Sequence, residues 1–259
     1  MKKLILPLFA VLAIVSCRKT SGVEETSSLK VSEQNLSVIA ERTATWCAPC
    51  GSYGMPKFQQ AKIDYNKKAV FMAWKDAFSE ALGGADGSDL FTKVGPRFKL
   101  GNSVPTSFVN FVKKGDESLL VDAHNKSEVV VNSNYSFSVT GNKLSLKTTT
   151  KFFKDVKGKY LMAPYLILND LQGYQNGHAD GSNTMHPNYV VGVALPKGHD
   201  KKLDFGYEIA NGNTKAGHTV SLEFTQEVDP TWLKHNLSYG LIMFKEQGDT
   251  LMFVNAFTK

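Results

Sequence analysis

The stretch "ATWCAPCG" (residues 44–51) decides how this chain folds, because it holds two cysteines separated by two residues. Trp46 precedes the first cysteine, and Pro49 lies between the two. A pair with this spacing serves one of three purposes: it binds a metal ion, closes a structural disulfide or carries out redox chemistry. The surrounding sequence favours one of the three.

The N-terminus indicates where the protein is located. Two lysines follow Met1, and residues 4–15 are almost wholly apolar. This run is too short to cross a bilayer as a helix, which takes roughly 20 residues, and the pattern is typical of a secretory signal. Its end, "IVSC" (14–17), resembles the bacterial lipoprotein cleavage box. The resemblance implies a signal peptide over residues 1–16 and lipid on Cys17; the alternative is an ordinary signal cut nearby, with Cys17 incidental.

Composition limits the classes of partner. Residues 17–30 are polar and predict a flexible tether. The hydrophobic content of 42% supports a packed core, and the length suits two modest domains or one large one. The formal net charge is +6, but the lysines are scattered through turns and form no basic helix or Arg-rich arm. We therefore expect no nucleic-acid partner.

The remaining cysteines favour redox chemistry. With Cys17 assigned to lipid, Cys47 and Cys50 can pair only with each other. A zinc site would need two further ligands, and neither a nearby histidine nor a second Cys-x-x-Cys is present. We predict no metal at this pair. An inert disulfide is possible in an exported protein, but so short a loop gains little from closure.

The local context predicts an activated thiol. "NLSVIA" (35–40) has the pattern of a strand, and residues 51–68 follow the second cysteine with a helical stripe. The stripe consists of Met55, Phe58, Ala61, Ile63 and Tyr65. A helix N-terminus favours an anion such as a thiolate, and it can lower a cysteine pKa from about 8.5 to roughly 3.5–7.5.

These features assign a role to each cysteine. We expect Cys47 to be the exposed nucleophile and Cys50, in the first helical turn, to be the resolving thiol. Pro49 suits this turn because its missing N–H is harmless there.

The run Trp46-Cys47-Ala48-Pro49-Cys50 resembles the thioredoxin active site, in which glycine usually stands where Ala48 is. The resemblance implies that Glu41, six residues before the first cysteine, is a buried acid that assists proton transfer. The alternative for Glu41 is an ordinary carboxylate at a strand end. "AVFMAW" (69–74) fits the next buried strand of such a fold.

A second motif of the thioredoxin family follows further along the chain. "NSVPTSFVNF" (102–111) resembles the loop that carries a cis-proline beside the active site. The resemblance implies a cis bond between Val104 and Pro105, and contacts of Val104 and Trp46 with substrate. "KKGD" (113–116) after it predicts a hairpin turn before "ESLLV". Pro56 lies one residue later than the usual kinking proline of the family, a departure that concerns the exact helix geometry and not the redox chemistry.

The second half of the chain has a different pattern. Strands with alternating apolar residues recur, for example at 135–141 and 142–152, where Gly141-Asn142 predicts a two-residue hairpin turn. We predict an α/β thioredoxin-like domain over residues 31–127, followed by an antiparallel β-sandwich over residues 128–259. A fragment of about residues 29–127 is expected to fold alone.

The whole layout also resembles a family of outer-membrane lipoproteins of Gram-negative bacteria named for a 28-kDa member. The match lies in "LILNDLQGYQNG" (166–177), in "HPNYVVGVAL" (186–195) and in the closing residues 239–257. It implies location and architecture more than activity. In the long loop 169–188, three side chains suggest a metal site, namely His178, Asp180 and His186; the alternative, which we favour, is a polar connection held by its own Asn and Asp side chains.

The sequence thus predicts a lipid-anchored thiol–disulfide oxidoreductase of the bacterial cell envelope, in the outer membrane and facing the periplasm or the surface. Its expected partners are protein thiols or disulfides, and the membrane through Cys17; no cofactor is expected. The Cys-Ala-Pro-Cys sequence favours a reductant. The alternative is a non-enzymatic lipoprotein that uses a thioredoxin-like scaffold and a β-sandwich to bind a partner.

Overall fold

The computed structural model describes residues 29–75, 87–113, 115–197 and 205–259. The predicted signal peptide, Cys17 and most of the tether lie outside these residues. Within the described part, none of the helices has the length and apolar character needed to span a bilayer.

The N-terminal region has the strand arrangement of a thioredoxin-like fold. β1 pairs in parallel with β2 and antiparallel with β3. The strands predicted at 35–40 and 69–74 are therefore confirmed as β1 and β2. The elements of this region are β1 (Ser37–Thr43), η1 (Cys50–Gly54), α1 (Met55–Asp64), β2 (Ala69–Lys75), α2 (Gly87–Arg97), β3 (Thr106–Val109) and α3 (Glu117–Lys126).

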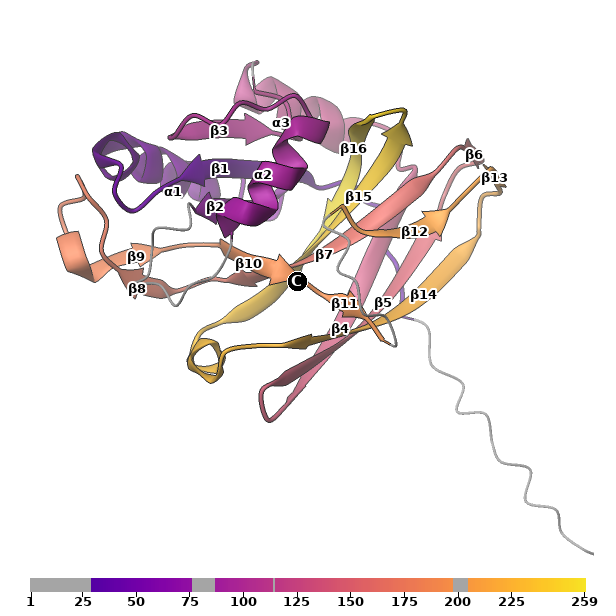
Figure 1. Ribbon diagram of the computed structural model, residues 1–259. Coiled ribbons are helices and arrows are strands. Elements are labelled where there is room, and N and C mark those ends of the chain that lie inside the picture. Colours follow the sequence, from indigo (N-terminus) through magenta and orange to yellow (C-terminus); the bar gives the residue numbers. More distant parts are fainter. Residues whose placement is uncertain (1–28, 76–86, 114, 198–204) are drawn as a thin grey trace, which may run out of the picture.

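Helices cover both faces of these strands (Figure 1). Residues of α1 and α3, such as Phe58 and Val121, pack on one face, whereas Phe91 of α2 belongs to the core on the other. The predicted stripe is correct for Met55, Phe58 and Ala61, which are buried, but Ile63 is 71% exposed. Five residues separate Phe58 from Ile63, which places the two side chains about 140° apart around a helix.

The segment after β3 differs from the prediction. The hairpin turn expected at 113–116 is wrong, because residues 117–126 form α3. Asp116 caps this helix: its carboxylate accepts a hydrogen bond from the Leu119 N–H at 3.0 Å. A local cap of this kind begins a helix where a hairpin turn was predicted.

The sheet does not end with the N-terminal region. Its strand order is β16-β15-β7-β10-β2-β1-β3, and β12 pairs with β7 beside this path. The start of β10 lies next to β2, with Tyr189 opposite Ala73 in a parallel bridge. The strands added from the second half are β7 (Tyr160–Leu168), β10 (Tyr189–Val193), β12 (Tyr207–Ala210), β15 (Leu237–Gln247) and β16 (Thr250–Phe257).

A second, four-stranded sheet has the order β11-β14-β5-β4. β4 contacts β15 and β16 of the large sheet, so the C-terminal region is β-rich and has two layers, as Figure 1 shows. This sheet consists of β4 (Val131–Thr140), β5 (Lys143–Phe152), β11 (Leu195–Pro196) and β14 (Thr219–Glu227). The smaller elements are β6 (Val156–Lys157), β8 (Leu171–Gly173), η3 (Gly181–Asn183), β9 (Thr184–His186), β13 (Asn213–Thr214) and η4 (Pro230–Lys234).

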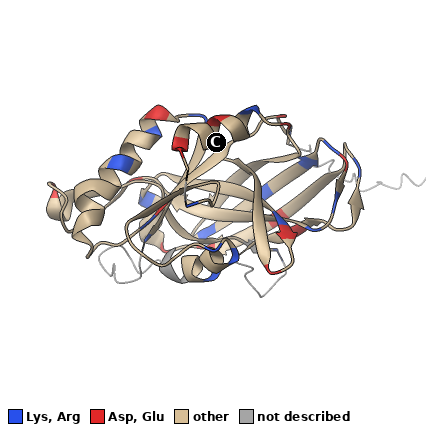
Figure 2. Cartoon of the chain, turned by 90° about the horizontal axis from the view of Figure 1, so that it is seen from above, with Lys and Arg blue, Asp and Glu red and all other residues tan. Residues whose placement is uncertain are grey.

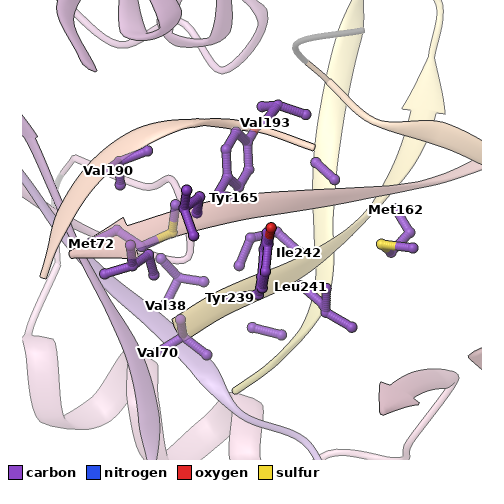
Figure 3. Packing of buried hydrophobic residues seen from close by; sticks show 14 of the residues in the cluster. Val38, Val70, Met72, Met162, Tyr165, Val190, Val193, Tyr239, Leu241 and Ile242 are labelled. Carbon is purple, nitrogen blue, oxygen red and sulfur yellow. The ribbon is translucent and has the colours of Figure 1, made fainter. Parts of the chain in front are cut away.

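One core joins the two regions. Val38 and Val70 of the first region pack with Tyr165, Val190 and Leu241 of the second (Figure 3). The predicted boundary between residues 127 and 128 falls between α3 and β4, and as a domain boundary it stays a prediction. The predicted sandwich needs one correction, however: one of its two layers is a continuation of the thioredoxin-like sheet.

A buried amide ties the last strand to the first. Asn255 of β16 is fully buried, and its side chain accepts from the N–H groups of Leu36 and Ala256. It donates to the carbonyl oxygens of Gln34 and Val131.

Charged residues are spread over the exterior, with both signs interspersed along the visible elements (Figure 2).

Candidate functional site

The two cysteines form a disulfide at the start of a helix. Cys47 and Cys50 are bonded, with their Cα atoms 5.2 Å apart. Cys50 begins η1, which continues into α1. Its backbone N–H donates to Cys47 Sγ at 3.1 Å, and the Cys47 carbonyl accepts from the N–H groups of Cys50 and Gly51. In the reduced state the same N–H groups and the helix N-terminus favour a thiolate on Cys47.

The pair is less exposed than predicted. Cys47 is 4% exposed and Cys50 is fully buried, so the expectation that Cys47 faces solvent is wrong. Ala44 and Val104 pack against the two cysteines, and residues 175–178 lie against the backbone of the motif. Trp46, by contrast, is 52% exposed and marks the open side.

The cis-proline loop lies beside the disulfide. The bond between Val104 and Pro105 is cis, as the sequence resemblance implied. The Pro105 ring approaches Gly54 of η1 so closely that a Cβ on this glycine would come 3.0 Å from it. The structure thus brings Val104, Pro105 and the cysteines together; substrate contacts of Val104 and Trp46 stay predictions.

Glu41 lies in β1 on the face that α1 covers. Ile39, on the same face, packs with Phe58 of α1, and alternate strand residues share a face. Glu41 is 1% exposed, and burial raises its pKa to about 7, against the positive charge of Lys75. The burial of Glu41 agrees with the buried acid that the resemblance implied, whereas its role in proton transfer stays a prediction.

Lys75 is a site residue that the sequence did not reveal. It ends β2, and its Nζ is buried without a hydrogen-bond partner among the described residues. Burial lowers its pKa to about 8, against the attraction of Glu41. The only sequence signal was a lysine that directly follows a wholly apolar strand. A buried acid and base whose pKa values both move towards neutrality are typical of functional sites.

His186 completes this buried group of ionisable side chains. It is fully buried just before β10, and its Nε2 lies 3.3 Å from the Gly173 carbonyl oxygen. Burial, followed by the charge of Lys75, lowers its pKa to about 3. His186 is therefore neutral and close enough to Lys75 to feel its charge.

The loop 169–188 does not gather its candidate metal ligands. His178 Nδ1 lies 3.6 Å from an Asp180 carboxylate oxygen, while His186 is buried against Gly173. Across the described ranges, no group of three His, Cys, Asp or Glu side chains is placed to hold a metal ion. The loop instead pairs with itself, β8 against β9.

Residues of this loop contact the redox motif, which sequence reasoning missed. Gln175 Nε2 donates to the carbonyl oxygens of Ala44 at 3.0 Å and Cys47 at 3.3 Å. Asn176 donates from its backbone N–H to Thr45 at 2.8 Å and from its side chain to Trp46 at 3.0 Å. Since about 130 residues separate the partners, no local signal could have indicated these contacts.

Comparisons with known proteins support the fold. No protein-family model and no curated protein matches the sequence. Among solved structures, HBP35 of Porphyromonas gingivalis is similar, with a TM-score of 0.67 and 15% sequence identity. The match covers 89% of this chain and 76% of HBP35. At this identity the likeness concerns the fold alone, and it supports a thioredoxin-like fold with a β-rich region.

Proposed function

We propose that this chain is a thiol–disulfide oxidoreductase in which Cys47 exchanges disulfides with a protein substrate. One observation carries the proposal: a disulfide at a helix N-terminus lies beside a cis-proline loop and on the same side of the sheet as a buried carboxyl group whose pKa is about 7. Each part has a use in thiol–disulfide exchange.

In the reducing direction, the Cys47 thiolate attacks one sulfur of a substrate disulfide. The substrate S–S bond breaks, a mixed disulfide forms, and one substrate sulfur leaves as a thiolate. The Cys50 thiol then loses its proton and attacks Cys47 Sγ. The Cys47–Cys50 bond forms, the second substrate sulfur leaves, and two electrons have passed to the substrate.

Glu41 is the group that accepts the proton of Cys50 in this scheme. A base works best when its pKa is near the working pH, and burial brings Glu41 to about 7. Lys75 holds that pKa below the value that burial alone would give. Glu41→Gln is expected to slow the second step by about 100-fold and to leave the first step unchanged.

The proposed location is the bacterial cell envelope, with lipid on Cys17 as the anchor. It is supported by the resemblance of residues 14–17 to a lipoprotein cleavage box and by the resemblance of the chain to the 28-kDa outer-membrane lipoprotein family. Cys17→Ser should release the protein from the membrane fraction. A variant that is processed and fractionates as the wild type does would contradict the anchor.

Trapping experiments test the chemistry. Cys50→Ser should accumulate a mixed disulfide with a disulfide-containing protein such as insulin, because Cys47 attacks and nothing resolves the product. Cys47→Ser should accumulate little, because Cys50 is fully buried. Non-reducing electrophoresis measures both, and equal trapping by the two variants, or none by either, would contradict catalysis.

The second candidate function is a non-enzymatic binding protein with a thioredoxin-like scaffold. The 4% exposure of Cys47 favours it, because a substrate sulfur must reach this atom. The thiol pKa of Cys47 in the reduced protein separates the two functions. An oxidoreductase needs a value well below about 8.5, whereas a scaffold does not.

A further inference from the structure

The backbone carbonyl groups of residues 44–47, the last of which is Cys47, all accept hydrogen bonds from two residues of the C-terminal region. Gln175 Nε2 contacts the Ala44 and Cys47 oxygens. Asn176 contacts the Thr45 oxygen through its N–H and the Trp46 oxygen through its side chain. A surface loop rarely saturates a neighbouring loop so completely, because buried carbonyls elsewhere are mostly satisfied within their own sheet or helix.

The approach of the two segments is close enough to require glycines. A Cβ at Gly51 would overlap with the Asn176 carbonyl oxygen, and a Cβ at Gly177 would overlap with the Ala48 carbonyl oxygen. Gly177 also has φ of +77°, a conformation that favours glycine. Each of the two segments therefore needs a glycine at the point of contact.

We propose that Gln175 and Asn176 are positioning residues for disulfide exchange, which act on Cys47 through the carbonyl groups of residues 44–47 and stabilise its reduced form. The proposal rests on the proposed oxidoreductase function. The hydrogen bonds of both residues go to the peptide groups that hold Cys47.

The physical reason is electrostatic. Carbonyl oxygens carry negative partial charge, and in a buried loop next to Cys47 this charge opposes a thiolate. Amide N–H donors on these oxygens offset it. The disulfide form carries no charge on Cys47, so the donors stabilise the reduced state more than the oxidised one. The expected effect of these donors is about threefold to tenfold in the equilibrium constant of reduction.

The alternative is a purely structural contact that holds the loop equally well in both redox states. In that case, loss of Gln175 lowers stability and leaves the reduction equilibrium unchanged. The two readings differ in the reduction potential and in the thiol pKa, and both quantities can be measured whether or not the protein turns over a substrate.

The test compares Gln175→Met with Gln172→Met. Methionine keeps the length of glutamine without its donors. Gln172 is the matched control because it lies in the same loop, is exposed and donates its side-chain hydrogen bond to Asn183, which belongs to that loop and not to the redox motif. Equilibration with glutathione should show a reduction constant about threefold to tenfold smaller for Gln175→Met, or about 15–30 mV more negative. The control should equal the wild type, and the Cys47 pKa should rise in Gln175→Met only.

A second variant keeps the test decisive if Gln175→Met fails to fold. Asn176→Ala removes the donor to the Trp46 carbonyl from a half-buried position and should shift the constant in the same direction, by up to about threefold. An unchanged potential and thiol pKa in a folded variant would overturn the proposal. If instead these shifts occur but trapping by Cys50→Ser fails, the positioning role stands and the proposed catalysis does not.

Discussion

The two ends of β1 both bury polar side chains, but in opposite states. At the start of β1, Asn255 makes four hydrogen bonds, which is the full capacity of its amide. Further along, Glu41 and Lys75 are equally buried, and each has a charged atom without a hydrogen-bond partner among the described residues. A saturated neutral amide fixes structure, whereas an unsaturated ionisable pair can exchange protons. Burial alone therefore does not distinguish the two ends of β1; an ionisable group with unmet hydrogen-bonding capacity is present at only one of them.

The prediction with the largest expected effect removes Asn255 together with the rest of the C-terminal region. Residues 29–127 lack β16 with Asn255, and they lack β10, so that β2 becomes an exposed edge. Trp74 also loses Tyr165, whose ring lies 5.1 Å away. We now expect this fragment not to fold cooperatively, the reverse of the expectation from sequence. Thermal unfolding followed by near-UV circular dichroism measures this, with residues 29–259 as the control that folds. A cooperative transition of the short fragment would show that the shared core is dispensable.

A point substitution of Asn255 removes only its hydrogen bonds and keeps the rest of the C-terminal region. Asn255→Ala leaves two N–H groups and two carbonyl oxygens without their partner, and it should lower the free energy of unfolding by about 2–4 kcal/mol. The exposed Asn211→Ala should change it by less than about 0.5 kcal/mol. Urea unfolding measures both. The reduction potential of Asn255→Ala should equal that of the wild type, and a shift would mean that the two ends of β1 are not separate in function.

Loss of the charged groups of Glu41 and Lys75, at the other end of β1, should increase the stability instead. Removing both charges in Glu41→Gln/Lys75→Met should raise the free energy of unfolding near neutral pH by about 1–4 kcal/mol, because desolvation outweighs the mutual attraction at both groups. The exposed Glu33→Gln should have no such effect.

The sign of the pH dependence follows from the two pKa values. Folded Glu41 keeps a proton up to about pH 7, whereas the unfolded chain loses it near 4.5. Wild-type stability therefore falls as the pH rises between these values. Lys75 restores stability between about pH 8 and 10.5, because the folded form loses its proton first. The gain of the double variant should be largest between pH 7 and 8. A gain that grows towards acid pH would contradict both assignments.

The smallest expected effect concerns His186. Its pKa falls from 6.5 to about 3 on folding, so its contribution to stability is lost as the pH falls below about 6.5. This slope opposes that of Glu41 between about pH 4.5 and 6.5. His186→Asn should remove it, which changes the pH dependence of unfolding by about 1 kcal/mol per pH unit. Urea unfolding at pH 5 and pH 6 measures the slope, and parallel curves for variant and wild type would contradict a buried neutral histidine.

Local signals in the sequence predicted the redox motif, β1, β2 and the cis bond before Pro105. Each of these depends on residues that are close together in the chain. α3 was missed although Asp116 provided a helix cap, because residues 113–116 were interpreted as a hairpin turn. The sequence was thus sufficient to predict the structure where one short motif determined it.

The remaining parts of the site arise from long-range contacts. The burial of Cys47, the hydrogen bonds from Gln175 and Asn176 and the proximity of His186 to Lys75 all depend on where β10 joins the sheet. An apolar run such as residues 189–193 predicts a strand but not its neighbour, because many edges would accept it. Pairing of β10 with β2 of the N-terminal region, in addition to β7 of its own region, could therefore not be predicted from the sequence.

Gln175 and Asn176, which cover the redox motif, follow it at a long distance in the sequence, and this has a consequence during protein synthesis. Gln175 follows Cys47 by 128 residues, which at about 5–20 residues per second corresponds to a delay of roughly ten seconds. In that interval both cysteines have emerged, and neither their cover nor β10 exists. A newly made chain therefore passes through a stage in which its thiols are open to oxidation by any oxidant nearby. The pairing of Cys47 with Cys50 can be decided before the mature fold restricts access to them.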